Sequence, residues 1–184
     1  MKGPLMAKPT IATGHFTGCF GCHMSLLDID ERILDLVELV EFRKSPVNDI
    51  KRFDGPVDIG LIEGGVSNNE NIEFLKMFRE HCRILVSVGA CAITGGVPAM
   101  RNTISLEECL REAYLDGPSV TDGIIPNDPD IPVMLDRVYP CHEVVKIDYF
   151  IPGCPPSGDT LWAALTALLR GEAPQLPYQL LKYD

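Results

Sequence analysis

The sequence lacks the features by which membrane proteins, secreted proteins and nucleic-acid-binding proteins are recognised. No apolar run approaches the ~18 residues of a membrane-spanning helix, and the first ten residues lack the apolar core of a secretory signal. There is no basic cluster, because 26 Asp and Glu outnumber 16 Lys and Arg and leave a formal net charge of −10. Such a chain repels phosphate backbones. We therefore expect no membrane insertion and no nucleic-acid partner.

Seven cysteines, an odd number, are spread over 184 residues whose hydrophobic content of 46% suffices for a core without disulfides. Because no secretory signal is evident, we expect a reducing, cytoplasmic setting, in which cysteines more often serve metal or redox chemistry. There are no internal repeats and no low-complexity segments. The sequence predicts a single domain over 1–184, with a core at about 10–171 and a C-terminal arm at 172–184.

Strand-like and helix-like segments alternate along the chain. Strands are expected at 10–13, 39–42, 57–62, 83–88 and 144–151, and helices at 26–37, 72–80, 105–115 and 159–169. The expected helix caps are Ser25, Asn68 or Asn69, Ser105, and Ser157 or Asp159, and 116–132 reads as a long surface loop. The segment 83–88 has almost no polar residue, as in a strand covered on both faces. The order predicts a doubly wound parallel α/β sheet of flavodoxin-like type.

Four cysteines lie in loops that follow predicted strands. Cys19 and Cys22 come after the first strand, Cys91 after 83–88 and Cys154 after the last strand. Ligand sites of open α/β sheets lie outside the carboxyl ends of the strands. The spacing of Cys19 and Cys22 lets two thiolates reach neighbouring corners of an iron–sulfur cluster, and glycines beside Cys91 and Cys154 permit close approach. A redox dithiol and a structural zinc site are the alternatives.

Other polar and thiol groups have simpler expected roles. Cys82 and Cys109 are expected to be buried thiols, whereas Cys141 is a reserve ligand expected at the end of the sheet opposite Cys154. Glu63 ends an apolar strand, where burial would raise its carboxyl pKa toward a value that suits a proton relay. Capping of backbone amides in the loop that follows is the alternative for Glu63. His23 is expected to donate a hydrogen bond to a cluster sulfide or to contact a partner.

Four segments, CFGCHMS at 19–25, IEGG at 62–65, GACAITGG at 89–96 and IPGCPP at 151–156, resemble the small subunit of [NiFe] hydrogenases, especially the cytoplasmic NAD-reducing type. The resemblance implies that Cys19, Cys22, Cys91 and Cys154 ligate one [4Fe-4S] cluster. It also implies a large subunit that binds the Ni-Fe centre, and a flavin and iron–sulfur diaphorase module that reduces NAD. The second cluster domain and the twin-arginine leader of many such subunits are missing, so we expect a cytoplasmic single-cluster relay of electrons.

Three alternatives accompany this reading. The homologous cluster subunit of respiratory complex I shares the fold but typically has adjacent cysteines, whereas two residues separate Cys19 from Cys22 here. A stand-alone flavodoxin-like or zinc-binding module would carry no electrons. FMN is a possible additional cofactor, because the segment 13–18, TGHFTG, is similar to a flavodoxin phosphate loop.

Overall fold

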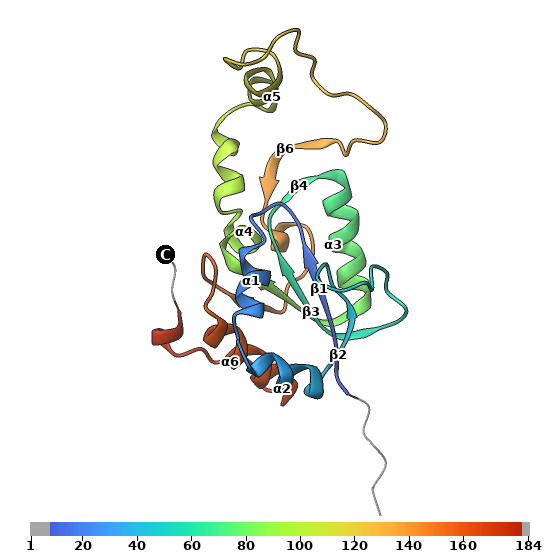
Figure 1. The fold of residues 1–184 in the computed structure, drawn as a ribbon, viewed down its shortest axis with the longest axis vertical. Helices are drawn as coiled ribbons and strands as arrows, with labels where there is room; N and C mark the ends of the chain where they lie inside the picture. The colour runs from blue at the N-terminus through green and yellow to red at the C-terminus, as the bar shows by residue number, and fades with distance from the viewer. Residues whose placement is uncertain (1–7, 182–184) are drawn as a thin grey trace, which may run out of the picture.

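The structure is a computed structural model that describes residues 8–181. Its centre is a sheet of five parallel strands, β1 (Thr10–His15), β2 (Glu41–Lys44), β3 (Val57–Glu63), β5 (Cys82–Val88) and β7 (Tyr149–Ile151) (Figure 1). The strands lie in the order β2-β1-β3-β5-β7. Counted among themselves, they follow the flavodoxin-like order 2-1-3-4-5. The predicted fold class is confirmed.

Helices cover both faces of this sheet. The helices are α1 (Gly21–Leu27), α2 (Arg32–Leu39), α3 (Asn69–His81), α4 (Gly89–Thr94), α5 (Leu106–Tyr114) and α6 (Gly158–Leu169), with 3-10 turns η1 (Val97–Thr103), η2 (Cys141–Glu143) and η3 (Tyr178–Leu180). Residues of α1, α2 and α6 form one buried cluster, and residues of α3 belong to the other. Successive strand residues alternate between the clusters, as Leu61 and Ile62 do, because side chains of a strand alternate between its faces.

Three predicted helix starts are confirmed by their caps. The side chains of Asn68, Ser105 and Ser157 accept hydrogen bonds from the backbone amides three residues later, at 2.8, 3.2 and 3.2 Å. The side chain of Met77 on α3 is exposed. Among the residues that the structure describes, no helix has the length and apolar character needed to cross a membrane.

The helix predicted at 26–37 is wrong, because the chain forms two short helices there. The backbone between α1 and α2 turns at Asp30, whose φ of 55° is left-handed and cannot continue a helix. Ile29, fully buried, anchors the turn in the core. Ser25 therefore caps nothing and lies buried within α1.

The strand predicted at 144–151 is also shorter than expected, since only Tyr149–Ile151 pairs with β5. A two-stranded antiparallel ribbon that the sequence did not reveal joins β4 (Val66–Asn68) to β6 (Met134–Tyr139). The segment 116–133 is an irregular surface loop, as predicted. The C-terminal arm returns to the core, where Thr160 Oγ1 donates a hydrogen bond to the Leu180 carbonyl; residues 182–184 of this arm lie outside the described residues.

Candidate functional site

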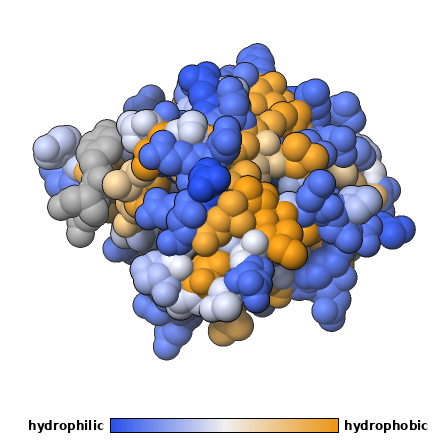
Figure 2. Space-filling view, turned by 90° about the horizontal axis from the view of Figure 1, so that it is seen from above, coloured by the Kyte–Doolittle hydropathy of each residue, from blue (hydrophilic) through white to orange (hydrophobic). Residues whose placement is uncertain are grey.

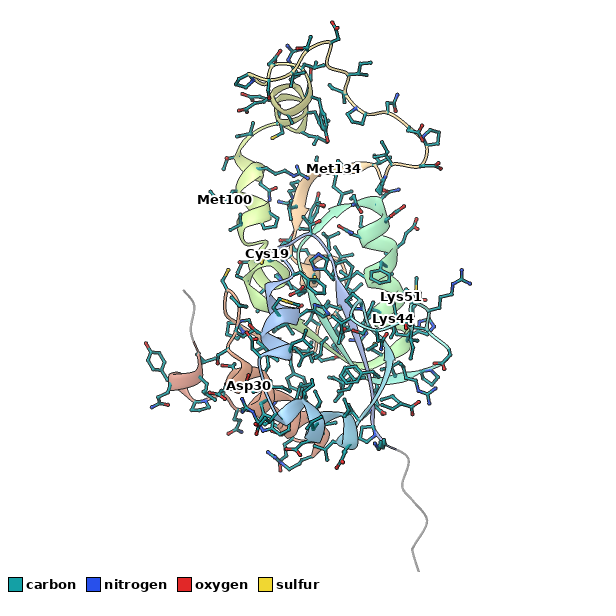
Figure 3. The ribbon with its side chains drawn as sticks, in the orientation of Figure 1. Cys19, Asp30, Lys44, Lys51, Met100 and Met134 are labelled. Atoms are coloured by element: carbon teal, nitrogen blue, oxygen red, sulfur yellow. The ribbon has the colours of Figure 1, made fainter. Side chains whose placement is uncertain are left out.

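The four cysteines singled out in the sequence lie in three loops at one edge of the sheet. Cys19 and Cys22 follow β1, Cys91 lies in α4 directly after β5, and Cys154 follows β7 (Figure 3 labels Cys19). Because β1, β5 and β7 belong to one parallel sheet, their carboxyl ends meet at the same edge.

Contacts between the loops bring the cysteines together. The Ala90 amide beside Cys91 donates a hydrogen bond of 2.8 Å to the Gly153 carbonyl beside Cys154. A methyl group on Gly89, whose φ is +82°, would lie only 2.3 Å from Cys22 Sγ, and one on Gly21 would lie 3.1 Å from Cys19 Sγ and 3.8 Å from Pro155. We call this region the cysteine edge. Glycine at these positions permits the close packing of the loops, since a Cβ at Gly89 would exclude the Cys22 sulfur.

The thiols lie within electrostatic reach of one another. The pKa of the Cys22 thiol is raised mainly by burial, and the negative charges of Glu63, Cys91 and Cys19 raise it further. Burial likewise raises the pKa of Cys91, with added repulsion from Cys154 and Cys19. Cys19 and Cys154 are exposed, whereas Cys22 and Cys91 are half-buried. The cysteine edge thus opens to the surface and gathers thiols whose ionisation a positive metal centre would favour.

Three groups are candidates for this site: a zinc ion, an iron–sulfur cluster and FMN. A single zinc ion needs its ligands about 2.0–2.3 Å from the metal, and within 8–181 no three His, Cys, Asp or Glu side chains are grouped closely enough to hold one ion. Four thiols from three glycine-bordered loops fit a larger iron–sulfide core. In the segment expected to bind the FMN phosphate, the Phe16 and Thr17 amides are bonded to the Glu63 and Gly65 carbonyls and so are not free to bind a phosphate. FMN binding stays a prediction.

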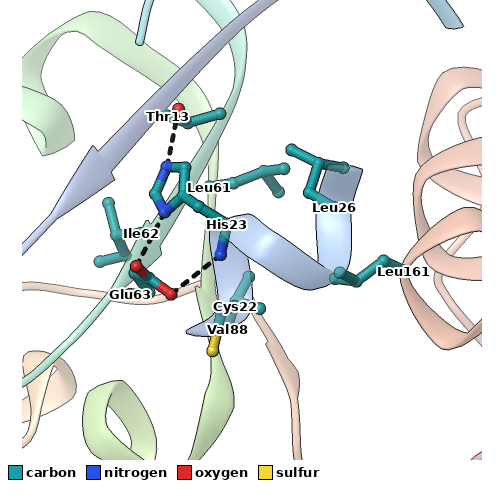
Figure 4. Close-up of a pocket in the computed structure, with 9 residues that line it drawn as sticks. All are labelled: Thr13, Cys22, His23, Leu26, Leu61, Ile62, Glu63, Val88 and Leu161. Carbon is teal, nitrogen blue, oxygen red and sulfur yellow. Dashed lines mark hydrogen bonds and ion pairs between the residues drawn. The ribbon is translucent and has the colours of Figure 1, made fainter. Parts of the chain in front are cut away.

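Glu63, at the end of β3, is buried directly beside the cysteine edge (Figure 4). Its Oε2 accepts a hydrogen bond of 3.1 Å from the His23 amide, and its Oε1 lies 2.9 Å from His15 Nδ1. His23 Nδ1 is also 2.9 Å from Oε1, although poorly aligned for a hydrogen bond. The carboxylate thus fixes the start of α1, next to Cys22.

The expected rise in the pKa of Glu63 is wrong. Burial acts in that direction, but the imidazole groups of His15 and His23 beside the carboxylate outweigh it and lower the pKa to about 2. The carboxylate is therefore ionised near neutral pH. The carboxylate does accept a backbone amide, but that of His23 on α1 rather than one in the loop after Glu63. A proton-relay role stays an untested prediction.

The ring of His23 is buried against residues of this chain, and its expected role, a hydrogen bond to a cluster sulfide or a contact with a partner, stays a prediction. It stacks on Phe20, with ring centroids 4.5 Å apart, and its Nε2 is 2.9 Å from Thr13 Oγ1. Thr13 in turn is a hydrogen-bond partner of Ser45 at 2.8 Å. Thr13 and Ser45 were missed in the sequence, because nothing local marks a threonine in an apolar strand as part of a buried polar chain.

The remaining three cysteines occupy different places in the fold. Cys82 is buried as expected, at the start of β5. Cys109, expected to be buried, is half-buried on α5. Cys141 is fully buried and its Sγ donates to the Gly64 carbonyl at 3.4 Å, so its expected place at the opposite end of the sheet is wrong. The turn η2 carries Cys141 back against α4.

Fold and site together define a flavodoxin-like domain with a four-cysteine edge. The sequence matches the family described as "NADH ubiquinone oxidoreductase, 20 Kd subunit" over residues 19–168, a stretch that includes all four cysteines. The chain belongs to this family, and within it to the hydrogenase small subunits.

Individual relatives agree with this assignment. The chain is 52% identical to the delta subunit of the NAD-reducing hydrogenase HoxS of Cupriavidus necator, over 96% of this chain and 86% of the relative. It is 40% identical to a subunit of the F420-non-reducing hydrogenase of Methanothermobacter thermautotrophicus, over 92% of this chain but only 56% of that longer protein. The resemblance inferred from the four sequence segments is confirmed.

Solved structures show the same relationship. A chain in the crystal structure of an NAD+-reducing [NiFe]-hydrogenase in the H2-reduced state superposes with a TM-score of 0.93 at 49% identity, covering 96% of this chain and 99% of that one. The [NiFeSe] hydrogenase of Desulfomicrobium baculatum, at 17% identity and a TM-score of 0.56 over 95% of this chain and 69% of its own, shares the fold alone.

Proposed function

We propose that this chain is the electron-transfer subunit of a cytoplasmic NAD-reducing hydrogenase. In this proposal Cys19, Cys22, Cys91 and Cys154 hold one [4Fe-4S] cluster. The cluster lies between a Ni-Fe centre in a large partner subunit and a diaphorase module that carries flavin and iron–sulfur clusters. The complex as a whole converts H2 and NAD+ into NADH and a proton, reversibly.

One observation carries the proposal: three loops far apart in the sequence present four thiols at one edge of the sheet. The hydrogen bond from the Ala90 amide to the Gly153 carbonyl joins two of these loops, and the close approach of Gly89 to Cys22 joins the third. When bound, such a cluster accepts and releases one electron at a time. The reaction assigned to the complex is supported by the high sequence identity of this chain to subunits of NAD-reducing hydrogenases.

The protein residues hold, orient and shield the cluster. Cys22 and Cys91, half-buried, would anchor its inner side, while the exposed Cys19 and Cys154 face outward, where a partner subunit can approach. The buried Glu63 carboxylate holds the His23 amide and thereby the loop that carries Cys22. This chain thus supplies a fixed position for the cluster, and the partner supplies the chemistry of H2.

The ligand assignment is tested by comparing the Cys91→Ala variant with the matched Cys109→Ala variant after anaerobic purification. We expect about four iron and four acid-labile sulfide per chain in the parent protein and in the Cys109 variant, with the EPR signal of a reduced cluster. The Cys91 variant should lose this signal and most of its iron. Full iron occupancy in the Cys91 variant, or stoichiometric zinc in the parent protein, would contradict the proposal.

A further inference from the structure

Residues 105–133, which form α5 and the loop after it, stand clear of the central sheet (Figure 1). We call this segment the acidic lobe. None of its residues is buried, although it contains leucine, isoleucine, valine and tyrosine side chains. Ile124 is 80% exposed and Val133 is 69% exposed. An amphipathic helix normally buries its apolar face against another element. Within the described part of this chain α5 contacts chiefly β6 among the elements, and this contact leaves none of its residues buried.

The apolar side chains of the acidic lobe line a groove between α5 and the returning chain. Leu106, Leu110 and Tyr114 line it from α5, and Ile131 and Val133 line it from the returning chain, together with Met134 at the start of β6. The groove encloses about 390 Å³, enough for several side chains rather than for a single water. Figure 2, which views this end of the molecule, shows hydrophobic residues bordered by hydrophilic ones.

The charge around the groove has one sign. The acidic lobe contains seven Asp and Glu residues and one basic residue, Arg111, and so carries six of the ten net negative charges of the chain. Arg111 is paired with Asp116 at 3.1 Å. Asp128 lines the groove itself. Two copies of this surface would repel each other, whereas lysine and arginine side chains of a different protein would complement it.

The base of the acidic lobe is fastened to the cysteine edge. The turn η1, which follows the Cys91 helix, donates hydrogen bonds from Arg101 to the Leu135 and Asp136 carbonyls. Asn102 exchanges two hydrogen bonds, of 2.9 and 2.8 Å, with the backbone of Val138. The strand β6 also pairs with β4, just beyond Gly64 and Gly65. A subunit seated on the cysteine edge therefore lies next to the acidic lobe.

We propose that the groove of the acidic lobe receives an apolar segment, flanked by Lys or Arg, of the partner subunit that covers the cysteine edge. This inference rests on the proposed function, in which that partner is the large Ni-Fe subunit. Apolar contacts in the groove provide affinity that persists in salt. The acidic residues around it accelerate and orient docking at low salt.

The test uses the complex of this chain with its large subunit, whose dissociation constant is measured at low and high potassium chloride. The Ile131→Ser/Val133→Ser variant removes exposed apolar groups, so the fold should persist, and we expect about a tenfold weaker complex at both salt concentrations. The Glu107→Gln/Glu108→Gln/Glu112→Gln variant should bind several-fold more weakly at low salt only. The matched control Leu34→Ser changes an equally exposed residue on α2 and should leave the affinity unchanged.

Iron content and the EPR signal of each variant separate this inference from the proposed function. If both variants keep an intact cluster and bind the large subunit as tightly as the parent protein does, the docking proposal alone is overturned. If the groove variants abolish self-association of this chain but not binding to the large subunit, the occupant is a second copy and the proposal is also overturned. A parent protein that holds no cluster and binds no large subunit overturns both ideas.

Discussion

The carboxylate of Glu63 accepts the backbone amide of His23, with Oε2 and N 3.1 Å apart, across 40 residues of sequence. This bond joins the end of β3 to the first turn of α1, immediately after Cys22. Because both residues are buried, water cannot readily replace the bond. The position of Cys22 thus depends on a residue that is not itself a proposed ligand.

We expect the Glu63→Gln variant to keep the cluster but to raise its reduction potential by roughly 30–100 mV. Glutamine retains an acceptor for the His23 amide, whereas removal of the nearby negative charge stabilises the reduced, more negative cluster. An EPR-monitored redox titration measures the shift. The exposed Glu73→Gln on α3 is the control and should leave the potential unchanged. A potential that falls, or stays constant, in the Glu63 variant would rule out this electrostatic role.

The Gly89→Ala variant should lose most of its cluster. Its added methyl group would lie 2.3 Å from Cys22 Sγ, at a φ of +82°. Gly171→Ala provides a matched control, since its φ is +76° with no atom within 4 Å of the added Cβ. Both variants should lose about 1–2 kcal/mol of stability through the left-handed backbone. Only Gly89→Ala should lower the iron content, and equal iron in the two proteins would contradict the predicted crowding.

The Thr13→Val variant should destabilise the fold by about 1–3 kcal/mol. The Thr13 hydroxyl connects His23 Nε2 and Ser45 Oγ, at 2.9 and 2.8 Å, and valine would leave both buried groups without this partner. Urea unfolding followed by circular dichroism measures the loss. The exposed Thr103→Val should stay within about 0.5 kcal/mol of the parent. A Thr13 variant as stable as the parent would mean that the hydroxyl chain contributes nothing.

Asp148 should make the stability of the protein fall in acid. Partial burial tends to raise its pKa, but hydrogen bonds from Arg79 and the Leu85 amide outweigh burial and lower it below its ordinary value. A depressed carboxyl pKa contributes stability above the unfolded pKa, near 4, and this contribution disappears as the pH falls through the folded pKa. We expect Asp148→Asn to cost about 1–3 kcal/mol at pH 7, and the gap to the parent to narrow below about pH 4.

Urea unfolding at several pH values measures this gap. The control is Glu172→Gln, which removes an exposed ion pair with Arg170 and should change the stability by less than about 1 kcal/mol at every pH. If the gap between Asp148→Asn and the parent were constant down to about pH 2, the carboxylate would not be the source of the acid sensitivity.

Local patterns predicted the parallel sheet well, because its central strands β3 and β5 are mostly apolar and are each followed by a glycine. They failed where a distant contact decides the structure. The break at Asp30 follows an anchoring residue, Ile29, that reads as one more apolar position of a helix. The ribbon of β4 and β6 pairs residues more than sixty positions apart, and β4 alone is too short to give a pattern.

The sequence by itself determined the fold class, the family and the cysteines to be examined, since these follow from strand periodicity and from motifs that are local in the chain. Only the tertiary structure decided what surrounds them. Burial favours a neutral Glu63, yet two histidines brought beside it from β1 and α1 keep it charged. Likewise, α5 forms at the predicted place, but none of its residues becomes buried in the described part of the chain. Both results depend on which neighbours the folded chain supplies, and a residue's own surroundings in sequence do not specify them.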